Sequence, residues 1–396
     1  MRVGVYFPGY PPEAGGGYTF EREILDTLID ISADSHHDIT AFSTHPHAEI
    51  IKSIAKSKNI RFYSFGRFSS IPAKINRRII KLLKIQKGHL SDLDEAAEKL
   101  GIECIWYITP VYRPVNIPYI ATVWDLQHRL QPWFPEVGNH QEWQIRENIY
   151  SNLIRRAAYV ITGSKTGQEE ISFFYQIPKE RIRVCPLPAP RLADKLSEIQ
   201  IQSVLNKFNL SPGFLLYPAQ FWPHKNHANL LLALKTLHDK FNANLDLVLV
   251  GSEKGNQEYI QKLTNDLGIE KNVHCLGFVS SEELVALYQS AFALTYLTFF
   301  GPDNLPPLEA FRIGCPVIAS AVQGSEEQLG NAAIFVEPSN PNAIANAVKS
   351  LMDDPNKRAE LINRGYQRAS RFTVKEYVRN VFNILDEFEN IRRAWK

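Results

Sequence analysis

Residues 301–320, GPDNLPPLEAFRIGCPVIAS, contain the signals for a helix that is followed directly by a buried strand. Asp303 or Asn304 can cap the helix at its start, and Gly314 can end it. The apolar residues 317–319 then predict a short buried strand. A helix joined to a strand in this way is typical of a parallel sheet with crossover helices.

The same alternation of short apolar runs and helical patterns extends over the rest of the chain. Strands are expected at residues 3–7, 118–124, 159–162, 214–217, 245–250, 273–276, 293–297, 317–319 and 333–336. The alternation is interrupted around residues 186–212, which are rich in proline and polar residues. The sequence therefore predicts an α/β protein of two doubly wound, Rossmann-like domains.

We expect the domains at residues 1–190 and 213–372, joined by a linker at 191–212. A last helix at 373–396 has Thr373 and Glu376 in the positions of a capping box. Its wide apolar stripe needs a large surface to cover, so it is expected to complete the first domain.

The composition is consistent with this organisation and excludes several classes of protein. A chain of 396 residues suits two domains, and 44 Lys and Arg against 42 Asp and Glu give no reason to expect a nucleic-acid partner. The four cysteines include no Cys-x-x-Cys pair, so neither a zinc site nor a disulfide framework is expected. No signal peptide or membrane-spanning run is evident, and a cytoplasmic location fits best.

Three glycines, Gly15, Gly16 and Gly17, follow the first expected strand and precede a helix. Backbone amides at such a position can approach an anion, and the helix dipole favours it. A plain flexible loop is an equal alternative. The segment does not match the dinucleotide-binding fingerprint, because Phe20 stands where Gly or Ala is required, and this disfavours a nicotinamide dehydrogenase.

Two charged residues lie near the carboxyl ends of expected strands, where open α/β sheets bind ligands. Glu309 would lie one turn into the helix described above, near its ligand-facing end. The alternative is a helix that serves only for packing, with the Glu309 carboxylate in solvent. Lys225, in YPAQFWPHKN at 217–226, could neutralise a pyrophosphate, although surface lysines are commoner. Its neighbours His224 and His227 lack further ligands at metal spacing, so we expect no metal site there.

A polar segment, TVWDLQHR at 122–129, follows a strand of the first domain. It places Asp125, His128 and Arg129 at the end of that strand, where polar groups suit contacts with an acceptor or a sugar. An ordinary strand-to-loop turn, with Asp125 capping backbone amides, is about as plausible.

Taken in order, these segments resemble the retaining nucleotide-sugar glycosyltransferases of family 4, which have the GT-B architecture. The resemblance covers almost the whole chain, and its specific parts are YPAQFWPHKN at 217–226 and NLPPLEAFRIGCPVIAS at 304–320. It implies two Rossmann-like domains that face each other across a cleft and bind a nucleoside diphosphate sugar between them. It implies neither a cofactor nor a metal.

The resemblance also assigns roles to residues. Glu309 corresponds to the second glutamate of the Glu-x7-Glu motif, which holds the donor ribose, and Lys225 to the phosphate-binding lysine. Asp125 and Lys225 are the expected catalytic residues. Donor binding is expected at Gly16, Gly17, Gln220, Lys225, Val279, Gly301, Pro302, Asp303, Asn304, Leu305 and Glu309, and acceptor or sugar contacts are expected at Trp124, His128 and Arg129.

Three side chains of the family pattern are missing. Gly301 stands at the first glutamate, Gln220 replaces the phosphate-binding arginine, and Trp124 replaces the histidine before Asp125. Because glutamine offers only neutral hydrogen bonds, Lys225 and helix-end amides are expected to bear more of the phosphate charge.

The function expected from the resemblance is transfer of a hexose, first of all from UDP-glucose, to a hydroxyl of a glycan or lipid-linked acceptor in polysaccharide biosynthesis. The anomeric configuration would be retained. The alternative is a non-catalytic subunit that binds a nucleotide sugar or acts as a scaffold.

Residues 74–87, KINRRIIKLLKIQK, carry six basic and no acidic side chains, with apolar residues at helical spacing. This pattern is typical of a helix that lies on an anionic membrane surface. Peripheral contact with the inner membrane face is therefore an expectation. A core-packed helix with a solvated basic face is the slightly favoured alternative.

Overall fold

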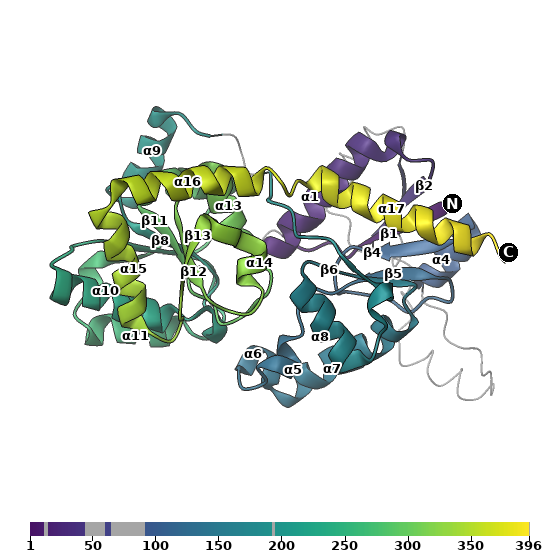
Figure 1. Cartoon of the computed structure of the whole chain (residues 1–396), viewed down its shortest axis with the longest axis horizontal. Helices are drawn as coiled ribbons and strands as arrows, with labels where there is room; N and C mark the ends of the chain where they lie inside the picture. Colours follow the sequence, from purple (N-terminus) through teal and green to yellow (C-terminus); the bar gives the residue numbers. More distant parts are fainter. Residues whose placement is uncertain (12–14, 44–59, 65–91, 192–194, 396) are drawn as a thin grey trace, which may run out of the picture.

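The computed structural model describes residues 1–11, 15–43, 60–64, 92–191 and 195–395. It contains two parallel sheets, each covered by helices on both faces, that lie side by side along the long axis of the molecule (Figure 1). The predicted α/β class with two Rossmann-like domains is confirmed.

The first sheet has seven strands in the order β3-β2-β1-β4-β5-β6-β7, all parallel. Its strands are β1 (Arg2–Phe7), β2 (Asp38–Ser43), β3 (Arg61–Ser64), β4 (Cys104–Tyr107), β5 (Tyr119–Thr122), β6 (Tyr159–Thr162) and β7 (Ile182–Val184). The strand order reverses between β1 and β4, so the loops that leave their carboxyl ends diverge and open a crevice there.

The second sheet has six strands in the order β10-β9-β8-β11-β12-β13, again all parallel. Its strands are β8 (Leu215–Pro218), β9 (Leu247–Val250), β10 (Val273–Cys275), β11 (Ala293–Tyr296), β12 (Val317–Ser320) and β13 (Ala333–Val336). Here the reversal lies between β8 and β11, the strands that precede Lys225 and Glu309, respectively.

Helices connect the strands of both sheets. The helices of the first half are α1 (Gly16–Ile31), α4 (Asp92–Leu100), α5 (Gln127–Leu130), α6 (Pro135–Gly138), α7 (His140–Arg156) and α8 (Lys165–Tyr175). Those of the second half are α9 (Glu198–Phe208), α10 (His227–Phe241), α11 (Gln257–Asp266), α12 (Ser281–Ser290), α13 (Leu305–Ile313), α14 (Ser325–Leu329), α15 (Pro341–Asp353), α16 (Pro355–Ala369) and α17 (Val374–Arg392). Among the described helices, none is long and apolar enough to cross a membrane.

The last helix, α17, returns from the second sheet to the first (Figure 1). It begins with a capping box in which Thr373 and Glu376 each accept a backbone N–H of the other. Its apolar stripe packs into the core formed by β1 and α1, and includes Val378 and Leu385, which are fully buried. Burial of this stripe holds the end of the chain on the N-terminal sheet.

Several elements were not predicted from the sequence. Strands β3, β4 and β7 have only three or four residues, whereas β2 has six but follows the largely polar residues 32–37. Residues 191–212, expected as a linker, include helix α9, which packs against α12. Ser197 and Gln200 form a capping box that starts this helix. The prolines and polar residues around it are typical of a linker, so the helix was not predicted.

Candidate functional site

The site is built where the connections after β1 and β11 meet between the two sheets. Gly16 lies in the first turn of α1, and a Cβ placed on it would lie 3.3 Å from the Leu305 side chain at the start of α13. The amino-terminal ends of two helices, one from each domain, therefore approach closely. A buried carboxylate, Glu21, fixes the preceding loop by accepting the backbone N–H groups of Gly9 and Tyr10 at 2.7 and 2.8 Å.

Helix α13 positions Glu309 as the sequence suggests. Asn304 is the N-cap residue, and Gly314 ends the helix in the left-handed conformation, with φ of 93°. The Glu309 side chain is buried and accepts a hydrogen bond from the Tyr288 hydroxyl at 2.9 Å. Burial raises the pKa of Glu309 to about 7. The alternative of a solvated glutamate on a packing helix is therefore excluded.

Lys225 lies at the strand reversal of the second sheet. It ends a short 3-10 turn, η4 (Pro223–Lys225), that directly follows the connection from β8. Its Nζ donates to the Tyr296 hydroxyl on β11 at 2.9 Å, and its backbone carbonyl accepts from the Tyr217 hydroxyl. Tyr296 thus holds the ammonium group, and Tyr217 on the neighbouring strand holds the Lys225 backbone, at the point where the sheet opens.

Gln220, which stands where the family resemblance expects arginine, is bonded to its own neighbours. Its Nε2 donates to Ser252 Oγ at 3.2 Å, and its Oε1 accepts from Trp222 Nε1 at 3.0 Å. The position therefore carries neutral hydrogen bonds and no charge.

Gly301, at the position of the missing glutamate, is glycine for a packing reason. A Cβ there would lie 2.6 Å from the backbone carbonyl oxygen of Gln323, which leaves no room for a side chain. The adjoining Pro302 is buried. The first carboxylate of the Glu-x7-Glu motif therefore does not fit in this arrangement.

Asp303 extends toward the other domain. It lies against Gly163, in the connection from β6 to α8, and a Cβ added to Gly163 would clash with the Asp303 carboxylate. The Oδ2 atom is buried and has no hydrogen-bond partner among the described residues. Burial, together with the nearby carboxylates of Glu327, Glu170 and Asp125, raises the pKa of Asp303 to about 7.

The amide of Asn304, expected to hold phosphate, is engaged within the protein. It donates to Gln328 Oε1 at 3.0 Å, and the Asn304 side chain donates to the Phe300 carbonyl at 3.1 Å. A phosphate at this amide would have to displace the Gln328 side chain. The loop at 277–279, which contains the expected donor-binding residue Val279, is fixed by a hydrogen bond from Gly251 N to Gly277 O, with Val279 buried and the Phe278 ring exposed.

The polar segment after β5 divides into two parts. Trp124 and Asp125 lie at the strand end, where Trp124 packs edge-on against Phe20 of α1. Its indole N–H is buried and has no hydrogen-bond partner among the described residues. Asp125 accepts from the Gln127 backbone N–H at 3.0 Å, as expected for a turn, and from Arg146 at 3.3 Å.

His128 and Arg129 instead point into the helical layer of the first domain. His128 is fully buried and lies 3.4 Å from the Glu147 carboxylate, and Arg129 pairs with the same carboxylate. The Arg129 guanidinium also covers the Tyr175 ring. In this arrangement, His128 offers no exposed surface for an acceptor or sugar contact.

Contacts between the domains form a part of the site that sequence reasoning missed. His224 stacks on Phe300 with ring centroids 3.9 Å apart, and its Nδ1 is bonded to Glu136 of α6. The imidazole pKa falls to about 4 because the ring is desolvated. Gln127 Nε2 donates to the Gly301 carbonyl at 2.8 Å.

A second contact joins α14 to α8. The carboxylate of Glu327 accepts the backbone N–H groups of Lys165 and Thr166, the first residues of α8, at 2.6 and 3.3 Å. A carboxylate at a helix N-terminus is favoured by the helix dipole. These partners are far apart in the sequence, so no local pattern could have indicated them.

A comparison with protein families gives a match within the second half of the chain. Residues 199–368 match the family described as glycosyl transferases group 1. This glycosyl transferases group 1 region contains Lys225, Gln220 and the whole of α13, and it ends within α16.

Curated relatives extend the similarity toward the N-terminus. The chain is 27% identical over 240 residues to O-antigen chain mannosyltransferase B of Escherichia coli, covering 60% of this chain and 63% of that protein. It is also 27% identical over 272 residues to the O-antigen chain mannosyltransferase RfbU of Salmonella typhimurium, covering 69% and 71%. The first alignment therefore spans less than two thirds of the relative's length.

Solved structures with a similar fold cover nearly the whole chain. Sucrose-phosphate synthase from Thermosynechococcus elongatus superposes with a TM-score of 0.72 at 18% identity, over 99% of this chain and 100% of that one. HepE of Anabaena, in complex with UDP and glucose, superposes with a TM-score of 0.68 at 18% identity, over 98% and 99%. The chain therefore has the GT-B fold, in which the group 1 region forms the second domain.

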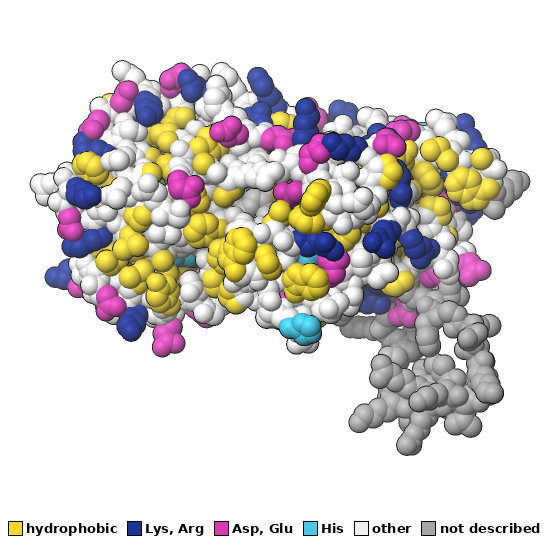
Figure 2. Space-filling view, turned by 60° about the horizontal axis from the view of Figure 1, so that its bottom comes forward, with side chains coloured by type: hydrophobic (Ala, Val, Ile, Leu, Met, Phe, Trp, Pro, Cys, Tyr) yellow, Lys and Arg dark blue, Asp and Glu magenta, His cyan; other side chains and the backbone are white. Residues whose placement is uncertain are grey.

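The face shown in Figure 2 carries Lys and Arg side chains interspersed with Asp and Glu, and hydrophobic side chains gather between them near its middle. Residues 74–87, for which membrane contact is expected, lie outside the described residues.

Proposed function

We propose that this protein is a glycosyltransferase that moves a hexosyl unit from a nucleoside diphosphate sugar to a hydroxyl of a glycan or lipid-linked acceptor in polysaccharide biosynthesis. The observation that carries the proposal is that buried Glu309 and Lys225 both follow strands at the strand reversal of the group 1 region. The glycine-rich start of α1 lies against the same helix end. The names of the O-antigen mannosyltransferases agree with this activity.

In this proposal, Glu309 accepts hydrogen bonds from the donor ribose, and Lys225 faces the diphosphate. Helix-end amides at Gly16 and Gly17 add positive potential on the other side. The exposed Phe278 ring and the backbone beside Val279 contact the base. Because Gln220 is neutral, Lys225 carries the largest side-chain share of the phosphate charge.

The acceptor hydroxyl attacks the anomeric carbon on the face from which the diphosphate departs. The new C–O bond forms as the bond to the diphosphate breaks, and a diphosphate oxygen takes the hydroxyl proton. Lys225 and the amides stabilise the charge that develops on the leaving group. This route retains configuration without a protein nucleophile. It suits a site in which Gly301 leaves no room for a second carboxylate.

On the acceptor side, the unpartnered indole N–H of Trp124 is a hydrogen-bond donor for a sugar hydroxyl. Asp125 holds the adjoining loop through Arg146 and accepts from the acceptor or the transferred sugar. The resemblance favours UDP-glucose as donor, whereas the names of the two relatives favour a mannosyl donor. We place the mannosyl donor first.

The test is nucleotide release from UDP-glucose and GDP-mannose, measured with and without a panel of glycan and lipid-linked acceptors. We expect sustained release that depends on both one donor and one acceptor, and a product whose anomeric configuration by NMR equals that of the donor. Tight donor binding without turnover for any acceptor would instead favour the non-catalytic alternative. An inverted product would overturn the same-face mechanism alone.

Peripheral membrane contact through residues 74–87 is also proposed, on the sequence pattern alone. Co-sedimentation with anionic liposomes should be salt-sensitive. It should be lost when Arg77, Arg78, Lys81 and Lys84 are changed to Gln.

A further inference from the structure

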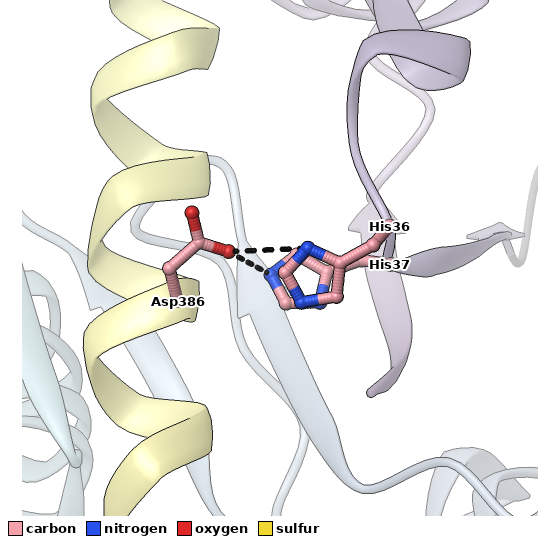
Figure 3. A group of neighbouring side chains, drawn as sticks. All are labelled: His36, His37 and Asp386. Carbon is pink, nitrogen blue, oxygen red and sulfur yellow. Dashed lines mark ion pairs between the residues drawn. The ribbon is translucent and has the colours of Figure 1, made fainter.

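Two consecutive histidines converge on one carboxylate at the edge of the first sheet, at the amino ends of its strands (Figure 3). His36 and His37 directly precede β2, and Asp386 lies on α17. The Asp386 Oδ1 atom is 2.9 Å from His37 Nε2 and 3.8 Å from His36 Nδ1. This edge lies at the opposite ends of the strands from the candidate donor site.

The buried histidine has an unsatisfied nitrogen that faces this carboxylate. The His37 side chain has no exposed surface, and its Nε2 has no hydrogen-bond partner among the described residues. Although Asp386 Oδ1 is close, the pair does not have hydrogen-bond geometry. Leaving a buried polar atom unpaired is costly, so an arrangement that satisfies it is favoured.

A metal ion satisfies the nitrogen without a change in the fold. Zn²⁺ binds His nitrogen and carboxylate oxygen at about 2.0–2.2 Å, so one ion bridges atoms up to roughly 4 Å apart. Both measured separations fall within this reach. The ligand atoms of the three residues all lie within 4.8 Å of one another, so a small shift of the largely exposed His36 side chain is enough to complete the set.

The surroundings resemble those of a bound metal. The other nitrogen of His36, Nε2, is 2.6 Å from Glu389 Oε2, one turn after Asp386 on α17. Metal-bound histidines commonly donate their second N–H to a carboxylate in this way.

Two positive groups lie nearby, the Met1 ammonium and the Arg393 guanidinium, which is 3.7 Å from Glu389 Oε2. The Met1 ammonium is 3.3 Å from His37 Nδ1 and donates to Glu389 at 2.9 Å.

We propose that His36, His37 and Asp386 form a Zn²⁺ site that ties α17 to the loop before β2. The ion would have a structural role, because α17 arrives from the second domain and covers the first. Sequence spacing could not show this site, since its ligands come from opposite ends of the chain.

The test uses the full, untagged chain after treatment with a chelator. Zn²⁺ is titrated against a chromophoric chelator, and thermal unfolding is followed with and without equimolar Zn²⁺. We expect one ion per chain and a rise of several degrees in the melting temperature, since a ligand that binds only the native state stabilises it. Co²⁺ in place of Zn²⁺ should give d–d absorption bands in the visible range.

His36→Gln and Asp386→Asn change exposed ligands and should fold. Each should weaken Zn²⁺ binding by at least about tenfold, the lower end of the effect seen for outer-shell partners, and should abolish the Zn²⁺-dependent rise in melting temperature. The matched control is Asp34→Asn, which removes another surface ion pair to α17, with Arg379 at 3.4 Å, and should leave Zn²⁺ binding unchanged. No stoichiometric binding by the parent, or equal binding by both ligand variants, overturns the site.

Discussion

Glu309 is a single residue whose burial, hydrogen bond and protonation can be tested together. If its carboxylate accepts ribose hydroxyls, Glu309→Gln should weaken nucleotide binding by about 10- to 150-fold, the equivalent of ~1.5–3 kcal/mol for a hydrogen bond to a charged group. Calorimetry with the free nucleotide gives the affinity, and Tyr288→Phe, which removes only the supporting hydroxyl, should have a smaller effect. An unchanged affinity with a sharply lower melting temperature would make Glu309 structural.

The raised pKa of Glu309 predicts the direction of the pH dependence. Its pKa of about 7 means that the carboxyl group becomes protonated as the pH falls through 7, and the neutral form accepts hydrogen bonds more weakly. Nucleotide affinity of the parent should therefore be lower at pH 6 than at pH 8. The Glu309→Gln variant should show a flatter profile, and equal profiles for the two proteins would contradict this assignment.

Lys225 is the second residue with a testable share of the site. Removing its charge in Lys225→Ala should reduce turnover more than stability, because the side chain is bonded only to the Tyr296 hydroxyl among the described contacts. Gln220→Arg should partly restore turnover in the Lys225→Ala background, since arginine offers phosphate a bidentate charged contact. Steady-state kinetics of the parent, the two single variants and the double variant completes a double-mutant cycle. Insensitivity to both positions would contradict the charge-sharing argument.

At the level of elements, the connection from β11 to α13 explains why one family position is glycine. A Cβ at Gly301 would meet the Gln323 carbonyl at 2.6 Å. Gly301→Ala should therefore destabilise the protein by about 1–3 kcal/mol, as expected for overpacking, and Gly301→Glu should do so at least as strongly without raising turnover. The control is Gly17→Ala, whose Cβ would make only ordinary contact with Tyr10. Denaturant unfolding compares them, and a stable, more active Gly301→Glu would show that the site accepts the missing carboxylate.

Prediction from sequence succeeded where the signals are local. Helix α13 has its cap, its stop and the following strand within twenty consecutive residues, so its place and that of Glu309 could be inferred. Strand β2 and helix α9 were missed because neighbouring polar residues obscured short patterns. The inward orientation of His128 depends on Glu147 and Tyr175, which come from other elements, and no pattern at residues 122–129 encodes it.

At the scale of the whole molecule, the two domains are held in contact by groups from distant parts of the chain. Phe134 of the first domain packs against Phe300 and Phe299 of the second, with ring centroids 5.3 and 5.6 Å apart. His224, which stacks on Phe300, adds a polar bond to Glu136. The residues expected to bind the donor lie on both sides of this interface. Donor affinity should therefore depend on the fraction of molecules in which the two domains are closed on each other.

Glu327 allows this dependence to be tested at a residue that is not itself expected to bind the donor. Its carboxylate accepts two backbone N–H groups at the start of α8, and an exposed charge at that position gains about 0.3–1 kcal/mol from the helix dipole. Glu327→Gln should therefore lower the ratio of closed to open molecules by roughly two- to fivefold. The apparent donor affinity should fall together with this ratio only when the closed form is no longer the major form.

The measurement is small-angle X-ray scattering of the free protein, combined with nucleotide affinity at low and high salt. We expect a larger radius of gyration for Glu327→Gln than for the parent, and a smaller difference between them at high salt, because exposed charges are screened. Glu326→Gln is the matched control, since it changes the same charge at the preceding, exposed position. If both variants scatter like the parent and bind nucleotide equally well, the contact between α14 and α8 does not control closure, and the aromatic contacts around Phe134 must hold the domains together.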